Sequence, residues 1–228
     1  MAGSHFFLLY VLYHDDASRA YAESHYGIHP HLRYFKIETN NYFESMMFIR
    51  HLSEVRAEWE GYEYVGMITW KADQKIRSTH IKNIHAVMMR TKAVGADIVA
   101  LRTNAHQRSM SMLDYAKQCH PNFIPLWNRL CEHLQYPEQA YTSRDIPAFY
   151  CNYWLCKKDW MERYIEHAQA AHQFLEENPD IQPMLNEDSK FDLPAPRNGM
   201  TYLTYHCFLM ERLPCLFFWW HKARLRVA

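Results

Sequence analysis

One stretch near the start of the chain limits the possible folds more than any other. The nine residues HFFLLYVLY (5–13) are almost continuously apolar. Such a run is typical of a strand buried on both faces, as in a parallel sheet that is covered by helices above and below. Other runs of the same character predict further strands at 31–37, 62–70, 97–102 and 148–157.

The segments between these strands have the spacing of helices. In 42–60, Phe48, Leu52, Val55 and Trp59 follow one another at intervals of four, three and four, which gives one apolar stripe. Other helices are expected within 14–27, 79–93, 107–135 (broken near His120-Pro121), 158–177 and 200–222, with a loop at 178–199. Strands that alternate with helices predict an α/β fold, with one domain over residues 1–228 and a mainly parallel central sheet flanked by helices.

Composition and missing motifs exclude several classes of protein. Lys+Arg and Asp+Glu both total 25, and this zero net charge argues against a nucleic-acid partner. The first strand has no GxGxxG after it and the chain has no Walker A motif, which disfavours a dinucleotide oxidoreductase or a P-loop NTPase. Six cysteines without a CxxC predict reduced thiols in the cytoplasm. The apolar run 213–220 falls short of the about 20 residues that cross a membrane.

Polar residues stand where three of the predicted strands end. In α/β sheets, ligands bind beyond the carboxyl ends of the strands. Tyr13, His14 and Asp15 follow the first strand, and an aromatic ring beside a carboxylate can stack on a nucleotide base and hold its polar edge. Thr69-Trp70-Lys71-Ala72-Asp73 ends the strand at 62–70, and Asn104-Ala105-His106 follows the strand at 97–102. The alternative is that each carboxylate is only a turn residue or a helix cap.

Four segments together resemble a known family. They are LLYVLYH (8–14), FESMMFIRHLSEVRAEWEGYEYVGMITWKAD (43–73), FYCNYWLCKKDWMERYIEHAQAAHQFLE (149–176) and GMTYLTYHCFLMERLPCLFFW (199–219). In this order they resemble the small GT-A-type glycosyltransferases of bacterial polysaccharide loci and large algal viruses. The resemblance covers most of the chain. It implies a GT-A-like domain that transfers a sugar from a nucleoside-diphosphate donor, with UDP expected, to a glycan acceptor. It also implies a place in the cytoplasm, that of the host for a viral protein, and further domains in a larger polypeptide.

The resemblance also implies a divalent metal, Mn²⁺ or Mg²⁺, that bridges the two phosphates of the donor. Family members hold the ion with an Asp-x-Asp turn, whereas this chain has Lys71-Ala72-Asp73 and keeps only the second carboxylate. The implied metal ligands are Asp73 and His206, a set that suits Mn²⁺ better than Mg²⁺. Lys71 is expected to add positive charge. The alternatives are a helix cap for Asp73 and a hydrogen-bonded core histidine for His206.

The donor and acceptor sugars need polar groups of their own. Asn152 lies on a strand of large side chains, so its amide needs a partner if it is buried. That partner is either a sugar hydroxyl or another group of the protein. Glu187 and Asp188 precede the last segment and are the expected catalytic residues, one acting as the general base for the acceptor hydroxyl. The alternative for both is a solvated acidic loop. The expected donor contacts are Tyr13, His14, Asp15, Thr69, Trp70, Lys71 and Asn152.

Two other functions fit the sequence. The missing first aspartate of the metal turn favours a degenerate GT-A domain that binds a nucleotide or glycan without turnover. Fifteen histidines also raise the possibility of a metallohydrolase, with His29 and His31 or His80 and His85 as ligand pairs. A hydrolase site would need clustered ligands, and pairs of this kind arise by chance among so many histidines.

Overall fold

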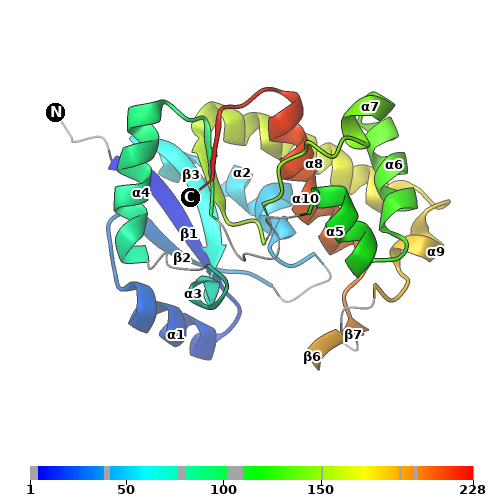
Figure 1. The fold of residues 1–228 in the computed structure, drawn as a ribbon. Coiled ribbons are helices and arrows are strands. Elements are labelled where there is room, and N and C mark those ends of the chain that lie inside the picture. The colour runs from blue at the N-terminus through cyan, green and yellow to red at the C-terminus, as the bar shows by residue number, and fades with distance from the viewer. Residues whose placement is uncertain are drawn as a thin grey trace.

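The computed structural model describes residues 5–38, 42–76, 81–101, 110–149, 151–189, 192–197 and 200–227. These residues form a six-stranded sheet with helices on both faces and a group of helices beside it (Figure 1). The predicted α/β class is therefore confirmed. The strands of the sheet are β1 (His5–Tyr13), β2 (Leu32–Lys36), β3 (Tyr62–Thr69), β4 (Ile98–Ala100), β5 (Trp154–Lys157) and β8 (Leu225–Val227).

Strand β1 is buried on both faces, as its sequence predicts. Leu8, Leu9, Tyr10 and Val11 have no exposed surface. Leu8 and Tyr10 belong to the apolar core on one face of the sheet, and Leu9 and Val11 belong to the core on the other. The alternating direction of side chains along a strand thus divides a continuous apolar run between two cores.

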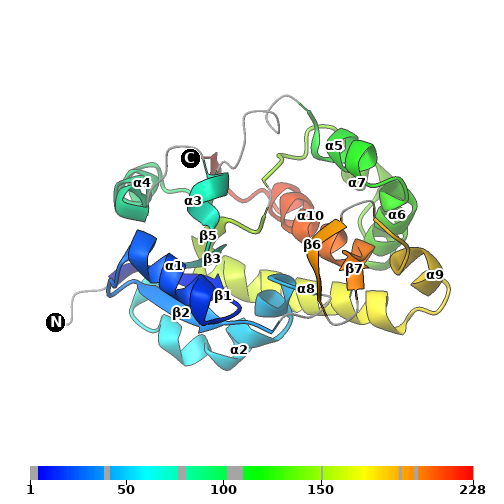
Figure 2. The same cartoon turned by 90° about the horizontal axis from the view of Figure 1, so that it is seen from below.

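Helices α1 (Asp16–Tyr26) and α4 (Ile81–Val94) cover one face of the sheet, and α2 (Leu52–Glu54) and α8 (Lys158–Glu177) cover the other (Figure 2). The helix predicted at 42–60 is present in part but irregular, because helical residues run from 45 to 54 and resume at 56–59. It consists of a π-helical turn, η1 (Met47–His51), followed by α2 and a 3₁₀ turn, η2 (Arg56–Trp59). The apolar stripe is still correct, because Phe48, Leu52 and Trp59 are all buried.

The sheet is mixed, so the prediction of a mainly parallel sheet is wrong. The strand order is β2-β1-β3-β5-β4-β8, and β5 runs antiparallel to both of its neighbours. A strand that runs parallel to the preceding one requires a crossover connection, which carries the chain back along the length of the strands before the next strand begins. Between β4 and β5, helices α5 (Met112–Cys119), α6 (Phe123–His133) and α7 (Glu138–Tyr141) instead join the helical group beside the sheet. The chain thus enters β5 at the carboxyl ends of β1 and β3, and β5 runs in the opposite direction to them.

The connections from the first strands reverse direction at β1. Strand β1 pairs in parallel with β2 on one side and with β3 on the other. The chain therefore leaves the carboxyl end of β1 toward one edge of the sheet and later crosses back to the opposite side of β1. Such a switch point separates the loops above two neighbouring strands and is the usual ligand position in this class of sheet.

The helical group contains the last long helix, α10 (Tyr205–Trp220). This helix was predicted within 200–222, with Pro214 either kinking or ending it; Pro214 lies inside the helix and does not end it. The expected break near His120 is confirmed by the gap between α5 and α6. The predicted loop at 178–199 contains α9 (Gln182–Leu185) and β6 (Asp192–Arg197), which pairs with β7 (Met200–Tyr202). The strand predicted at 148–157 is confined to β5.

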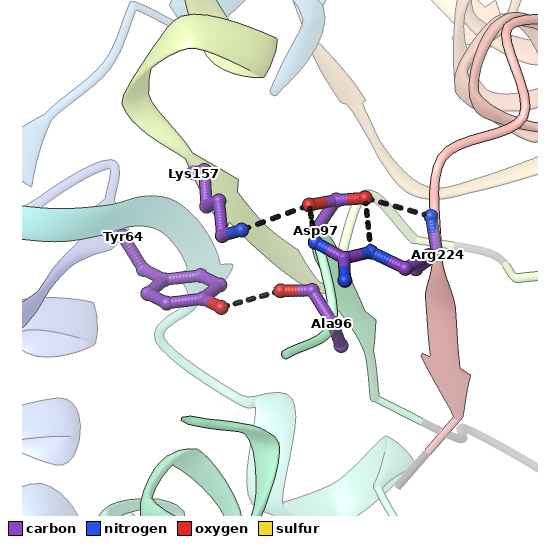
Figure 3. Close-up of polar contacts among 5 residues, drawn as sticks. All are labelled: Tyr64, Ala96, Asp97, Lys157 and Arg224. Atoms are coloured by element: carbon purple, nitrogen blue, oxygen red, sulfur yellow. Dashed lines mark hydrogen bonds and ion pairs between the residues drawn. The ribbon is translucent and has the colours of Figure 1, made fainter. Parts of the chain in front are cut away.

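An ion-pair network fastens the short strands at one edge of the sheet (Figure 3). Asp97 Oδ1 accepts from Lys157 Nζ at 2.9 Å and from Arg224 Nη2 at 3.0 Å. Asp97 Oδ2 accepts from the backbone N and the Nε of Arg224, both at 3.0 Å. Beside this network, the Tyr64 hydroxyl donates to the carbonyl of Ala96. The network holds β8 to β4 and to the end of β5.

Two other predictions concern the chain as a whole. In the described ranges, none of the helices combines the length and the apolar character needed to span a bilayer. The single domain over 1–228 stays a prediction. It agrees with α8, which contacts β3 and β5 of the sheet as well as α6, α9 and α10 of the helical group.

Candidate functional site

The residues after β1 form the start of α1. Asp15 is the N-cap of that helix: its carboxylate accepts from the Ser18 backbone N at 2.7 Å, and Ser18 Oγ accepts from the Asp15 N at 2.9 Å. His14 N also donates to Ser18 Oγ, and the Tyr13 ring lies 5.7 Å from the Arg19 guanidinium carbon. Asp15 therefore has the cap role that the sequence offered as an alternative, and the nucleotide contacts of Tyr13, His14 and Asp15 stay predictions.

The residues after β3 lie at the same edge of the sheet. The Thr69 hydroxyl is buried and contacts the Tyr153 hydroxyl. Trp70 packs edge-on against Tyr21, and the Lys71 ammonium lies 5.2 Å from the Trp70 ring. Thr69 thus has a structural partner, whereas Trp70 and Lys71 are partly exposed beside the switch point.

Asp73 lies on the short helix α3 (Ala72–Lys75) and faces α1. Its Oδ2 accepts from the Tyr21 hydroxyl at 2.9 Å and its Oδ1 accepts from the Tyr26 hydroxyl at 3.0 Å. The Tyr26 hydroxyl also accepts from the Asp73 backbone N. Both oxygens of the carboxylate are therefore engaged in joining α3 to α1.

His206 is buried where α10 packs on α8. Its Nε2 lies 3.0 Å from His172 Nδ1. Burial and the neighbouring His172 lower the pKa of His206 to about 3, so the ring is neutral at pH 7. His206 belongs to a group with His172 and Glu176, and this group does not include Asp73.

The structure does not bring Asp73 and His206 together as a shared metal site. Asp73 faces α1, whereas His206 lies where α10 packs on α8, and each side chain has other partners. The residues at this pair do not fit the Mn²⁺ or Mg²⁺ that the resemblance implies.

Glu187 and Asp188 lie with the helical group. The Asn122 side-chain amide donates to the Glu187 carboxylate, and the Asn122 backbone N donates to the Tyr205 hydroxyl at 3.1 Å. Burial raises the pKa of Tyr205, and the charges of Glu187 and Asp188 raise it further. The two carboxylates therefore stand near the first residues of α6 and α10. Their role as catalytic residues stays a prediction.

The other histidine and strand-end candidates add little. Residues 80, 104 and 106 lie outside the described residues. The rings of His29 and His31 stack with their centroids 5.9 Å apart. Within the described ranges they belong to no group of three metal-ligating side chains.

A group of charged side chains that the sequence analysis missed lies at the entry to β5. We call it the carboxylate–lysine cluster: Glu44, Lys75, Cys151 and Glu211. The Cys151 backbone N donates to the Glu211 carboxylate, and Lys75 Nζ lies 4.0 Å from Cys151 Sγ. The four residues come from the segment before η1, from α3, from the turn before β5 and from α10. Since Lys75 follows β3 and Cys151 precedes the antiparallel β5, the cluster lies at the edge where β3 ends.

The charges of the cluster change one another's titration. Burial raises the pKa of the Glu44 carboxyl, the nearby charge of Glu211 raises it further, and Lys75 and Lys71 oppose the rise. Burial lowers the pKa of Lys75, but the neighbouring Cys151 and the carboxylates of Glu44 and Glu211 outweigh this effect and leave it raised. Burial raises the pKa of the Cys151 thiol to about 12, so it is protonated at neutral pH.

The turn that carries Cys151 has an unusual backbone. Cys151 and Asn152 have φ angles of 64° and 53°, in the left-handed region that side chains other than glycine rarely adopt. Asn152 is only 4% exposed, and its Oδ1 has no hydrogen-bond partner among the described residues. Asparagine tolerates the left-handed region better than cysteine does, so the strain lies at Cys151; a strained residue beside an unsatisfied buried acceptor is a feature that clusters at functional sites.

Sequence signals for this cluster exist only in part. Glu211 and Arg212 are two adjacent charges inside the apolar helix α10, and Arg212 is 3% exposed. Arg212 Nη1 donates to the Glu211 carboxylate, which explains how the charge of Arg212 can be buried beside the partly exposed Glu211. A charged pair inside an apolar run is therefore a signal that could have been used. Glu44 lies in an ordinary polar context and gives none.

The cluster contains a carboxyl group that can donate or accept a proton, and beside it lie lysines that can bind an anionic ligand. A partly buried glutamate whose pKa is raised is better suited to proton exchange than one in bulk water. Lys71 and Lys75 provide positive charge at the end of β3, where it can stabilise an anionic leaving group. A surface pocket with Gly61, Lys157 and Asp159 in its lining lies at the opposite edge of the sheet, where β3 begins, and plays no part in this site.

Comparison of the chain with protein-family models, curated proteins and solved structures finds no match. The assignment of a function therefore depends on the site and on the resemblance described above.

Proposed function

We propose that the chain is a glycosyltransferase that moves a sugar from a nucleoside-diphosphate donor, UDP-linked in the first instance, to a hydroxyl of a glycan acceptor. The observation that carries the proposal is the buried acceptor of Asn152, which has no partner in the described chain and adjoins the carboxylate–lysine cluster. A sugar hydroxyl would donate to this oxygen once the turn of Cys151 and Asn152 moves to admit it. The switch point at β1 supports the same position for the donor.

The roles follow from charge and position. Tyr13, His14 and Trp70 stand at the ends of β1 and β3, where a nucleotide base and ribose would lie. Lys71 and Lys75 bind the diphosphate and stabilise the negative charge that develops on it as it leaves. In the Asp-x-Asp turn that the resemblance implies, Lys71 stands in place of the first aspartate, so this end of β3 is basic where the family is acidic.

The transfer needs a base for the acceptor. The acceptor oxygen forms a bond to the anomeric carbon, the bond from that carbon to the diphosphate breaks, and the nucleoside diphosphate leaves with the electron pair. Glu44 takes the proton of the acceptor hydroxyl, because its raised pKa brings it closer to neutral pH than an exposed glutamate. Glu211 is held in position by the Cys151 N–H and by Arg212.

The other parts of the proposal follow the resemblance. The partners are a nucleotide sugar and a glycan rather than a nucleic acid, and the protein acts in the cytoplasm, that of the host for a viral protein. The degenerate, non-catalytic domain remains the second candidate. It is favoured by one observation, the engagement of both Asp73 oxygens by tyrosines.

A donor panel tests the proposal. UDP, GDP, CDP and TDP, and their common sugar derivatives, are added to the full chain in a thermal-shift assay, with and without Mn²⁺. A ligand at 100 times its Kd stabilises a protein by about 2.7 kcal/mol, which raises Tm by about 5–10 °C for a chain of this size. Lys75→Ala should weaken binding of the best nucleotide at least tenfold, whereas Lys117→Ala, at an exposed position on α5, should not.

Turnover is then measured with Glu44→Gln. We expect product from the wild type and at least a 100-fold lower rate from Glu44→Gln with unchanged donor binding. Binding without product in the wild type would select the non-catalytic domain. No stabilisation by any nucleotide, or equal affinities for Lys75→Ala and Lys117→Ala, would overturn the proposed site.

A further inference from the structure

A second group of ligating side chains lies away from the carboxylate–lysine cluster, between α8 and α10. It consists of His172, Glu176 and His206, and we call it the α8–α10 triad. His172 and Glu176 are one helical turn apart, so they share a face of α8. His206 is in the first turn of α10. One nitrogen of each histidine and one carboxylate oxygen all lie within 4.8 Å of one another.

These distances are close to those of a ligand set. His172 Nδ1 and His206 Nε2 are 3.0 Å apart. Two imidazole nitrogens that bind one Zn²⁺ at 2.0–2.1 Å in tetrahedral geometry are about 3.3 Å apart. The two nitrogens are therefore within a few tenths of an ångström of the separation that they need, whereas the carboxylate oxygen, which lies within 4.8 Å of them, must come closer and the rings must turn toward the ion.

The buried ring of His206 has a nitrogen that forms no hydrogen bond with the described residues. His206 is 1% exposed, and its Nδ1 has no hydrogen-bond partner among the described residues. Its other nitrogen has only His172 as a partner, which is itself a candidate ligand. An ion at the triad would bind Nε2 and leave Nδ1 unchanged, so the support for a ligand comes from Nε2, which among the described residues has a hydrogen-bond partner only within the triad.

A fourth side chain supports the triad from outside. The Tyr42 hydroxyl donates to Glu176 Oε2 at 2.7 Å. The Tyr42 ring stands edge-on to both histidines, with its centroid 4.6 Å from that of His206 and 5.1 Å from that of His172. Hydrogen bonds that orient a carboxylate in this way are typical of the groups around a metal site, which fix the direction of its ligands.

The donor set selects the kind of ion. Two imidazoles and one carboxylate are a common Zn²⁺ set, whereas Mg²⁺ and Ca²⁺ prefer oxygen ligands alone. Glu176 is exposed and His172 is partly exposed, so one side of the triad faces solvent. We propose that the α8–α10 triad is a binding site for a divalent transition metal of the Zn²⁺ type. Water or a ligand from solution fills the remaining position, and the ion joins α8, α10 and the segment that holds Tyr42.

The site is tested by direct metal binding, independently of any transferase activity. The full chain is freed of metal with a chelator and titrated with Zn²⁺, Co²⁺, Mn²⁺ and Mg²⁺ by calorimetry. We expect one Zn²⁺ per chain, weaker Mn²⁺ and no measurable Mg²⁺. Co²⁺ bound in tetrahedral geometry should give visible absorption bands, which adventitious binding to surface histidines would not give in a one-to-one ratio.

Matched variants decide which residues hold the ion. Glu176→Gln should weaken Zn²⁺ binding more than about 100-fold, and Tyr42→Phe about tenfold. The controls are Glu177→Gln, the adjacent exposed glutamate of the same helix, and His29→Ala in the exposed His29–His31 pair, and neither should change the affinity. Since Glu176 is exposed, its variant should fold even if one at the buried His206 does not.

Equal Zn²⁺ affinities for Glu176→Gln and Glu177→Gln would overturn the proposal. So would a loss on His29→Ala, or binding of several ions with no one-to-one phase.

Discussion

The Asp97 network predicts a specific loss of stability. Asp97→Asn keeps the shape of the side chain but removes the charge that Lys157 and Arg224 share. The Asp97 side chain is 12% exposed and Lys157 is 30% exposed, whereas Arg224 is 63% exposed, so solvent screens the arginine pair most. We assign about 1 kcal/mol to the lysine pair and about 1–2 kcal/mol to the weakened bond from the Arg224 backbone N. The total is about 2–3 kcal/mol, or a fall in Tm of about 4–10 °C.

The same network predicts how this difference depends on pH. The hydrogen bonds from Arg224, and then those from Lys157, hold the pKa of Asp97 well below its usual value, although burial opposes them. A carboxyl whose pKa is lowered by folding contributes its full stability above its unfolded pKa, about 3.9, and loses it as the pH falls toward the folded pKa. The stability difference between wild type and Asp97→Asn should therefore be constant from pH 8 to 5 and shrink below about pH 4.

Urea denaturation at several pH values measures this difference, with Asp180→Asn as the control at an exposed carboxylate that no described side chain contacts. The reasoning would be refuted by an Asp97→Asn variant as stable as Asp180→Asn at pH 7. It would also be refuted by a difference that does not shrink at pH 3.

Two further predictions concern single positions. Gly66→Ala should destabilise the protein by about 2–3 kcal/mol, because a Cβ there would lie 2.3 Å from the Trp154 carbonyl oxygen. The control is Gly61→Ala, where a Cβ meets nothing within 4 Å and only φ is unfavourable, so it should cost about 1 kcal/mol. Equal melting temperatures for the two variants would contradict this. Asp73→Asn should cost about 1–2 kcal/mol through its two tyrosine bonds and leave nucleotide affinity unchanged in the thermal-shift titration. A loss of nucleotide affinity without a loss of stability would make Asp73 a ligand after all.

The fold was predictable from the sequence where a pattern has one physical solution. A continuous apolar run such as 5–13 can be satisfied only by burial on both faces, and the position of β1 follows from it. The direction of β5 was not predictable, because an apolar run reads the same for a parallel and an antiparallel strand. Strand β8 and the β6–β7 pair are short, and their pairing depends on contacts such as Asp97–Arg224 between residues far apart in the sequence.

For the candidate site at the ends of β1 and β3, only the location was predictable from the sequence. The ends of β1 and β3 were expected to carry it, and the switch point lies there. The partners of each side chain were not predictable: Asp73 and Tyr26 are brought together by the packing of α3 on α1, and Glu44 and Glu211 by the packing of four segments. Asn152 was chosen because a polar group on a buried strand needs a partner, and its Oδ1 has none in the described chain.

Helix α10 carries both His206 and Glu211, separated by about one and a half turns. A metal ion at the α8–α10 triad would restrain the same rigid rod that holds the carboxylate of the proposed transferase site. Each ligand that binds lowers the conformational entropy of α10, and once the first has bound that entropy is already lost, so the second binds more tightly. Such a coupling is reciprocal: whatever factor Zn²⁺ adds to the affinity for a nucleotide sugar, the nucleotide sugar adds to the affinity for Zn²⁺. The protein would then respond to the supply of metal through the geometry of one helix.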